Sequence, residues 1–121
     1  MNHSPYLNQA LSDLPAIVER AHDALRGKAF DAIVVTGVSG LLVGSALAYA
    51  MKKRLAVVRK ADDRNNHAIV GVESGMELHD RWIFVDDIIA SGRTIARVRR
   101  IMADTMVGSY MYNWNEWTEG D

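Results

Sequence analysis

Two adjacent carboxylates, followed by small and hydroxyl residues, form the part of this sequence best suited to chemistry. Asp86 and Asp87 come directly after an unbroken apolar run at 82–85 (WIFV) and shortly before the stretch 90–94 (ASGRT). An apolar run that ends at polar residues is typical of a buried parallel strand. A helical pattern opens at the end of ASGRT, so its backbone N–H groups are expected at a helix N-terminus, where an anion is stabilised. Strand, acid pair, anion turn and helix in this order indicate a site for a phosphorylated polyol.

A second small-residue turn follows an earlier predicted strand. Residues 32–35 (AIVV) are β-branched and too short for a helix, which favours a central strand, and residues 36–40 (TGVSG) come next. Two glycines around a serine let the backbone approach a ligand closely, and the helix predicted at 41–51 offers its first N–H groups. A tight turn that serves only helix packing is the alternative interpretation.

Residues 82–94 (WIFVDDIIASGRT) closely resemble the signature of the type I phosphoribosyltransferases, which bind 5-phosphoribosyl-1-pyrophosphate (PRPP). The match holds at every position type: four hydrophobic residues, two acidic ones and a Thr/Ser-Gly-x-Thr loop. The resemblance implies that Asp86 and Asp87 contact the ribose hydroxyls, take part in catalysis and hold Mg²⁺ directly or through water. It also assigns the 5′-phosphate to the loop; the residues implied to bind substrate there are Ile88, Ile89, Ala90, Ser91, Gly92, Arg93 and Thr94.

The same resemblance gives roles to the earlier turn and to the residues after the second predicted strand. The turn lies one βα unit before the acid pair, where the family binds pyrophosphate; its residues are Thr36, Gly37, Val38, Ser39 and Gly40. Arg59 and Lys60 follow a strand predicted at 55–58 and leave the same sheet edge, where ligands of open α/β sheets bind. Strand-Arg-Lys resembles the orotate and adenine enzymes, which implies that Arg59 binds substrate and Lys60 contributes to catalysis. Strand-end solubility is the alternative.

Segment 61–80 is the least regular part of the chain, and we expect it to form a loop. A loop of this length in a small domain is usually functional. It matches the family's flexible catalytic loop, which implies that Arg64 binds the departing pyrophosphate and that His67 contributes to catalysis. A plain loop histidine is the alternative for His67.

Two tryptophans bear on the acceptor. Trp114 and Trp117 lie in a polar stretch, residues 113–121, after a last strand predicted at 106–112. Aromatic faces suit base stacking. The resemblance to the family implies that this stretch is a tail or a minimal hood that covers the base. Packing of the tail on the core, or a dimer contact, is the alternative. Ala90 stands where enzymes for 6-oxopurines usually have an aspartate, which counts against guanine or hypoxanthine.

Helices must cover the sheet that these strands form. A helix capped by Ser12 or Asp13 and ending at Gly27 has an apolar stripe suited to one sheet face. A further helix is predicted from Arg93, with its arginines facing away from the core. Residues 1–11 are an arm of unknown order.

The composition limits the classes of function. The 121 residues are 49% apolar and carry a net charge of −1, with acids and bases mixed along the chain. This fits one compact domain at 1–121 and argues against nucleic-acid or membrane binding through bulk charge. The sequence has no cysteine, and it shows neither a basic-apolar signal nor an apolar run of membrane-spanning length. A cytoplasmic protein is expected.

Together these features predict an α/β, Rossmann-like type I phosphoribosyltransferase fold with a mainly parallel sheet of about five strands and helices on both faces. The resemblance covers about residues 30–112 and implies a homodimeric enzyme. Such an enzyme uses PRPP and Mg²⁺ to phosphoribosylate a nucleobase and releases pyrophosphate. The alternative is a non-catalytic module that senses PRPP or a nucleotide through the same site.

Overall fold

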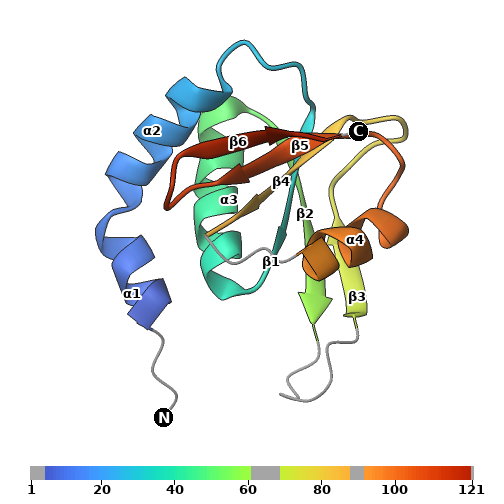
Figure 1. Cartoon of the computed structure of the whole chain (residues 1–121), viewed down its shortest axis with the longest axis horizontal. Helices are drawn as coiled ribbons and strands as arrows, with labels where there is room; N and C mark the ends of the chain where they lie inside the picture. Colours follow the sequence, from blue (N-terminus) through green and yellow to red (C-terminus); the bar gives the residue numbers. More distant parts are fainter. Residues whose placement is uncertain (1–4, 61–68, 88–91, 121) are drawn as a thin grey trace.

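The chain builds a six-stranded sheet with helices on both faces (Figure 1). The computed structural model describes residues 5–60, 69–87 and 92–120. In chain order the elements are α1 (Pro5–Ser12), α2 (Leu14–Leu25), β1 (Ala32–Thr36), α3 (Val38–Met51), β2 (Arg54–Lys60), β3 (Ile69–Ser74), β4 (Trp82–Asp86), α4 (Gly92–Ile101), β5 (Met106–Met111) and β6 (Glu116–Glu119). The strand order is β3-β2-β1-β4-β5-β6.

The four central strands are parallel, and the two outer strands, β3 and β6, are antiparallel to their neighbours. This confirms the predicted α/β fold with a mainly parallel sheet and helices on both faces. The sheet has six strands where about five were predicted, and the two strands for which no range was predicted are β3 and β6. Each pairs with the outer strand of the parallel set, whose N–H and C=O groups would otherwise form an open edge.

The prediction of an irregular segment at 61–80 is therefore wrong for its central part. Ile69–Ser74 forms β3, which pairs with β2 from Ala56↔Ser74 to Lys60↔Ile69 and has a register shift between Arg59 and Lys60. The polar half of the segment, residues 61–68, lies outside the described residues. The tail at 113–121 likewise contains a strand, β6, which pairs with β5.

Alternate residues of the central strands serve two hydrophobic cores. On β1, Ile33 and Val35 face the core shared with α1, α2 and α3, whereas Ala32 and Val34 face the core that α4 covers through Val98. All five residues of β1 are buried. Both faces of a central parallel strand lie under helices, so its sequence is a continuous apolar run.

The helix boundaries differ in detail from those predicted. The arm at 1–11 contains α1, and α2 ends at Leu25, just before Gly27 with its positive φ of 84°. Asp13 is the N-cap residue of α2, but it makes no side-chain cap hydrogen bond within the described part of the chain. None of the described helices is long and apolar enough to cross a membrane.

Ion pairs close the amino edge of the sheet, where the parallel strands begin. Arg54 donates two hydrogen bonds to Asp80, Nε to Oδ2 at 2.7 Å and Nη2 to Oδ1 at 2.6 Å. Arg81 pairs with Asp31 at 3.2 Å, and its backbone N–H donates to the same carboxylate at 2.9 Å. The Trp82 indole N–H donates to the carbonyl oxygen of Ala103 at 2.7 Å. These contacts join loops that are far apart in the sequence.

Candidate active site

The predicted acid pair and the predicted pyrophosphate turn meet at the carboxyl edge of the sheet. β1 lies between β2 and β4, and β4 lies next to β5, so the residues after these strands emerge side by side (Figure 1). Asp86 ends β4 in register with Met111 of β5. The backbone N–H of Tyr112 then donates to the Asp86 carbonyl oxygen at 3.0 Å, which continues the ladder beyond both strands.

The two carboxylates of the acid pair are partly or largely buried. Asp87 is 9% exposed, and its backbone N–H donates to Oδ1 of Asp86 at 2.9 Å. A side chain placed on Gly40 would begin 3.7 Å from the same Asp86 oxygen. The first turn of α3 therefore lies directly against the acid pair, and glycine at this position leaves room beside the carboxylate.

The turn after β1 is shorter than predicted, because α3 begins at Val38 and not at residue 41. Gly37 is the N-cap residue with φ 69°, a left-handed conformation that suits glycine. The first turn closes with the N–H of Leu41 donating to the Gly37 carbonyl oxygen at 3.1 Å. Val38, Ser39 and Gly40 thus carry the first N–H groups of the helix, which have no acceptor one turn earlier.

This helix start suits an anion. The N-cap residue of α3 is Gly37, which has no side chain that could accept a hydrogen bond from the first N–H groups of the helix. The positive end of the α3 dipole is therefore directed to the carboxyl edge, beside Thr36, which is buried at the end of β1. The geometry brings together the predicted residues Thr36 to Gly40 with Asp86 and Asp87.

Tyr112 is a site residue that the sequence analysis did not single out. It is 1% exposed at the end of β5. Burial raises the pKa of its phenol, the charges of Asp87 and Asp86 raise that pKa further, and an interaction with the Ser39 side chain lowers it. Together with the backbone hydrogen bond to Asp86, these influences indicate that Tyr112 adjoins the acid pair. The sequence marked Tyr112 only as the end of an apolar strand, and no local pattern distinguishes it from Tyr110.

Arg59 and Lys60 were predicted to follow a strand, but they lie within one, because β2 runs to Lys60. The Arg59 guanidinium pairs with Glu73 of β3 at 3.3 Å, and both side chains are well exposed. Lys60 pairs through its backbone with Ile69, and its side chain lies outside the described part. Arg59 thus lies at the carboxyl edge of the sheet, as predicted, and its guanidinium is paired with the Glu73 carboxylate.

Several predicted site residues fall outside the described residues; these are Arg64, His67, Ile88, Ile89, Ala90 and Ser91. Of the signature loop, the structure describes Gly92, Arg93 and Thr94, which form the first turn of α4. Four residues separate Asp87 from Gly92, so this helix also starts near the carboxyl edge. Arg93 is exposed and lines a surface hollow of about 430 Å³ with Arg97 and Arg100.

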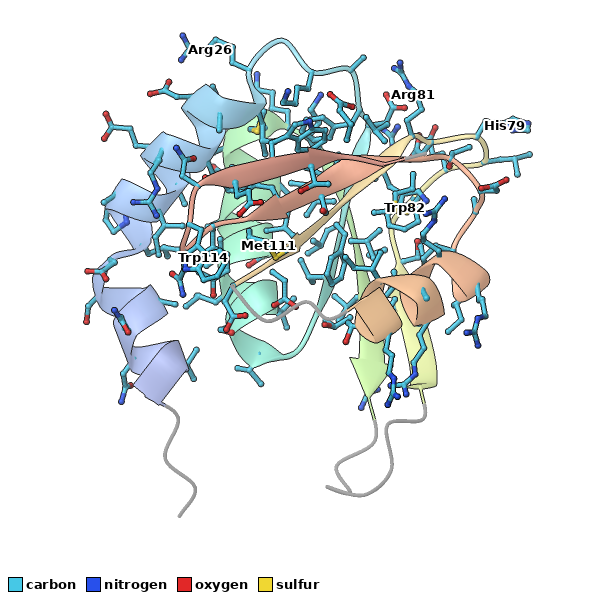
Figure 2. All side chains as sticks on the ribbon, viewed as in Figure 1. Arg26, His79, Arg81, Trp82, Met111 and Trp114 are labelled. Atoms are coloured by element: carbon cyan, nitrogen blue, oxygen red, sulfur yellow. The ribbon has the colours of Figure 1, made fainter. Side chains whose placement is uncertain are left out.

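The two tryptophans lie in different surroundings. Trp117 is in β6, packs on the core beneath α1–α3, and has the Lys28 ammonium 4.6 Å from its ring centroid. This matches the alternative in which the tail packs on the core. Trp114 is 64% exposed and lines a hollow of about 400 Å³ together with residues of α1 and α2, including Gln9 and Arg20. Figure 2 shows it near the carboxyl end of β5, away from Arg81 at the amino edge.

The donor set at this edge fits a magnesium ion that substrate helps to hold. Asp86 and Asp87 supply carboxylate oxygens, the ligands that Mg²⁺ prefers, and the ion usually takes only one or two of them with waters and substrate phosphates. Within the described ranges no group of three or more His, Cys, Asp or Glu side chains is placed to form a metal cage.

Comparison with known proteins agrees with the signature. The chain matches no protein-family model. It is 33% identical over 102 residues to an adenine phosphoribosyltransferase of Marinobacter nauticus, an alignment that covers 74% of this chain and 54% of that protein. The chain therefore spans about half the length of this curated relative.

Solved structures share the fold. The adenine phosphoribosyltransferase of Thermoanaerobacter pseudethanolicus superposes with a TM-score of 0.66 at 21% identity, over 87% of this chain and 70% of that one. The UMP synthase of Leishmania donovani gives a TM-score of 0.68 at 18% identity, over 87% of this chain and 23% of that one. These likenesses show a Rossmann-like α/β fold. In sequence and in fold the chain is related to the type I phosphoribosyltransferases.

Proposed function

We propose that the protein is a phosphoribosyltransferase that uses PRPP and Mg²⁺, transfers the phosphoribosyl group to a nucleobase, and releases pyrophosphate. One observation carries the proposal: the acid pair and the start of α3 are in contact, with Asp86 Oδ1 3.7 Å from where a Gly40 side chain would begin. PRPP carries hydroxyls and a pyrophosphate on neighbouring carbons. A site for both must place hydroxyl acceptors beside anion-binding N–H groups.

In this proposal each part of PRPP has its own partner. The Asp86 and Asp87 carboxylates accept hydrogen bonds from the ribose hydroxyls. The N–H groups of Val38, Ser39 and Gly40 bind the pyrophosphate, and the start of α4 binds the 5′-phosphate. Asp86 and Asp87 would also hold Mg²⁺, which neutralises charge on the pyrophosphate when bound.

The reaction proposed is a displacement at C1 of the ribose. The C1–O bond to pyrophosphate breaks and its electron pair leaves with the pyrophosphate, while a ring nitrogen of the base forms the new C1–N bond and gives up its proton to solvent. The residues of this chain act by holding the two reactants in line and by stabilising the departing anion. No covalent bond to the protein is needed.

We propose the exposed face of Trp114 as the stacking surface for the base. Trp114 lies two residues beyond Tyr112, which is hydrogen-bonded to the acid-pair backbone. Its ring borders an open hollow, so a planar ligand has room beside it. Adenine is the first base to test, because the curated relative is an adenine phosphoribosyltransferase.

The test is isothermal titration with Mg²⁺ and PRPP, followed in the same sample by adenine, orotate, guanine and hypoxanthine with pyrophosphate release as the readout. Saturable PRPP binding and release with one base would support the transferase and identify its acceptor. Binding without release for any base would move the assignment to the sensing module. Absence of PRPP binding would overturn both.

A further inference from the structure

A hollow of about 400 Å³ lies beside Trp114, where α1 and α2 meet the residues that follow β5. Figure 2 shows Trp114 on the side of the molecule that α1 and α2 occupy. The residues that line the hollow include Gln9, Asp13, Ile17, Arg20, Asn113 and Trp114. Arg20 Nη2 donates to the Tyr112 carbonyl oxygen at 2.6 Å, and the Tyr112 N–H donates to the Asp86 carbonyl oxygen at 3.0 Å. Two hydrogen bonds therefore connect the hollow to the acid pair.

Gln9 and Asp13 lie on one helical face at the junction of α1 and α2. The Asp13 N–H donates to the Gln9 carbonyl oxygen at 3.0 Å, and the Ile17 N–H donates to the Asp13 carbonyl oxygen at 2.9 Å. The helical hydrogen bonds thus continue across the junction, and residues four apart are neighbours on a helix surface. Ile17 is 4% exposed and belongs to the core, whereas Gln9 and Asp13 are exposed. This wall of the hollow therefore has an apolar end and two polar side chains one turn apart.

The charges of the hollow balance. Among its described lining residues, Asp13 supplies one carboxylate and Arg20 one guanidinium. Within residues 5–60, 69–87 and 92–120, the Asp13 side chain makes neither a cap hydrogen bond to α2 nor an ion pair. A carboxylate accepts hydrogen bonds and donates none, whereas the Gln9 amide can donate. This set suits a neutral ligand with an N–H donor beside an acceptor, while an anionic base meets no net positive charge.

We propose that this hollow binds a neutral nucleobase with an exocyclic amino group, and that Asp13 selects the amino group by accepting its hydrogen bond. The inference rests on the proposed function, in which Trp114 stacks on the base. In a 6-aminopurine the amino donor adjoins a ring-nitrogen acceptor, so the Asp13 carboxylate and the Gln9 amide complement the two groups. A 6-oxopurine presents a carbonyl oxygen in place of the amino group, and that oxygen would face the Asp13 carboxylate.

The isosteric variant Asp13→Asn tests this selection. An amide donates as well as accepts, so it tolerates a carbonyl as well as an amino group. Asparagine is as good an N-cap residue as aspartate, so the start of α2 is retained. Isothermal titration of the wild type should show a preference of about tenfold or more for adenosine over inosine 5′-monophosphate, the scale of one hydrogen bond to a charged group. In Asp13→Asn the preference should fall to about threefold or less, with PRPP affinity unchanged.

Asp23→Asn is the matched control. Asp23 is an exposed carboxylate of the same helix, and its Oδ1 accepts a hydrogen bond from Arg26 at 2.9 Å, outside the hollow. We expect this variant to keep both the nucleotide preference and the PRPP affinity of the wild type. A purely structural defect in Asp13→Asn would instead lower Tm and weaken both nucleotides and PRPP alike. The ratio of the two nucleotide affinities is therefore the readout specific to base recognition.

The outcomes are distinguishable. If the wild type binds PRPP but does not prefer the amino nucleotide, or if Asp13→Asn keeps the preference, the role of Asp13 is overturned and the proposed function stays intact. A parallel loss of all three ligands with a lower Tm would also overturn the selective role. Absence of PRPP binding by the wild type would overturn the proposed function, and this inference with it.

Discussion

The two edges of the sheet both carry aspartates, but they arrange them in opposite ways. At the amino edge Asp80 is nearly buried and faces the Arg54 guanidinium, with two hydrogen bonds of 2.7 and 2.6 Å. At the carboxyl edge Asp86 and Asp87 stand beside each other at the end of β4, and the Asp87 N–H donates to Asp86 Oδ1 at 2.9 Å. Opposite charges in hydrogen-bonded contact stabilise the fold, whereas two neighbouring carboxylates at a strand end suit a ligand that supplies hydroxyls or a cation.

The carboxyl ends also have the features of a binding surface that the amino ends lack. Helix starts at Val38 and Gly92 open there, with N–H groups that the helix itself does not use. The amino edge has loops joined by Asp31–Arg81 and Arg54–Asp80 pairs. We therefore expect substitutions at the carboxyl edge to change binding, and substitutions at the amino edge to change stability.

The largest effect is expected from Asp87→Ala. It removes one of the two carboxylates proposed to hold ribose and Mg²⁺, so PRPP affinity should fall by about 100-fold or more. We expect its effect on Tm to be smaller than that of Asp80→Ala, which breaks the two guanidinium hydrogen bonds of the amino edge. Isothermal titration and a thermal melt measure the two quantities. Asp104→Ala, at an exposed carboxylate beyond α4, is the charge-matched control. Retained PRPP affinity in Asp87→Ala would sink the assignment of the site.

Asp80→Ala should show the reverse pattern. It deprives Arg54 of its partner and leaves the Glu77 N–H, which donates to Asp80 Oδ2 at 2.8 Å, without that acceptor. We expect Tm to fall by about 5 °C or more, on the scale of other broken polar networks. PRPP affinity, measured well below Tm, should be close to that of the wild type. A large loss of affinity with normal Tm would contradict the division between the edges.

Substitutions of Trp114 and Trp117, which lie in one hairpin, should also separate an effect on binding from an effect on stability. Trp117→Ala removes a ring that packs on the core and covers Gly108, and should lower the free energy of unfolding by about 2 kcal/mol. Trp114→Ala removes an exposed ring and should leave the unfolding free energy unchanged within about 0.5 kcal/mol. It should instead raise the KM for the base by about tenfold, the scale of one stacking contact. Identical effects of the two substitutions would argue against Trp114 as the base platform.

Acid should weaken the amino edge specifically. The Arg54 guanidinium lowers the pKa of Asp80 from 3.8 to about 2. Because the folded state holds this proton less tightly than the unfolded state, ionised Asp80 stabilises the fold above about pH 4, and this contribution is lost as the pH falls toward 2. Denaturant unfolding between pH 5 and pH 2.5 should therefore show a smaller acid-induced loss of stability for Asp80→Asn than for the wild type. Parallel curves would show that another group controls acid stability.

The smallest effects are expected at Arg59 and Glu73. Their ion pair is exposed, so Arg59→Ala should change the unfolding free energy by less than about 1 kcal/mol. If Arg59 also binds substrate, as the family resemblance implies, Arg59→Ala should weaken PRPP binding about twofold. Glu73→Ala should then strengthen binding by a similar factor, because a competing carboxylate is gone. Titration of both variants decides between these roles. The same change in both would leave Arg59 with a surface role alone.

Much of the carboxyl edge could be predicted from the sequence, since its features are local. The apolar run 82–85 gives a strand because both faces of the sheet are covered, and the acid pair marks its end. Gly37 was identified as a residue that permits φ > 0, and it has φ 69°. The loop 61–80 was predicted poorly because Ile69–Ser74 becomes a strand only by pairing with β2, and the six-residue stretch alone does not specify that partner.

The sequence by itself determined the strand and helix pattern, the family signature, and the placement of the acid pair one βα unit after the glycine turn. These depend on the order of residues along the chain. Only the tertiary structure decided that Gly40 lies against Asp86, that Arg59 faces Glu73, and that the Tyr112 N–H donates to the Asp86 carbonyl oxygen. Such contacts depend on strand order, register and helix packing, which the sequence fixes through many weak interactions spread over the whole chain and not through any local pattern.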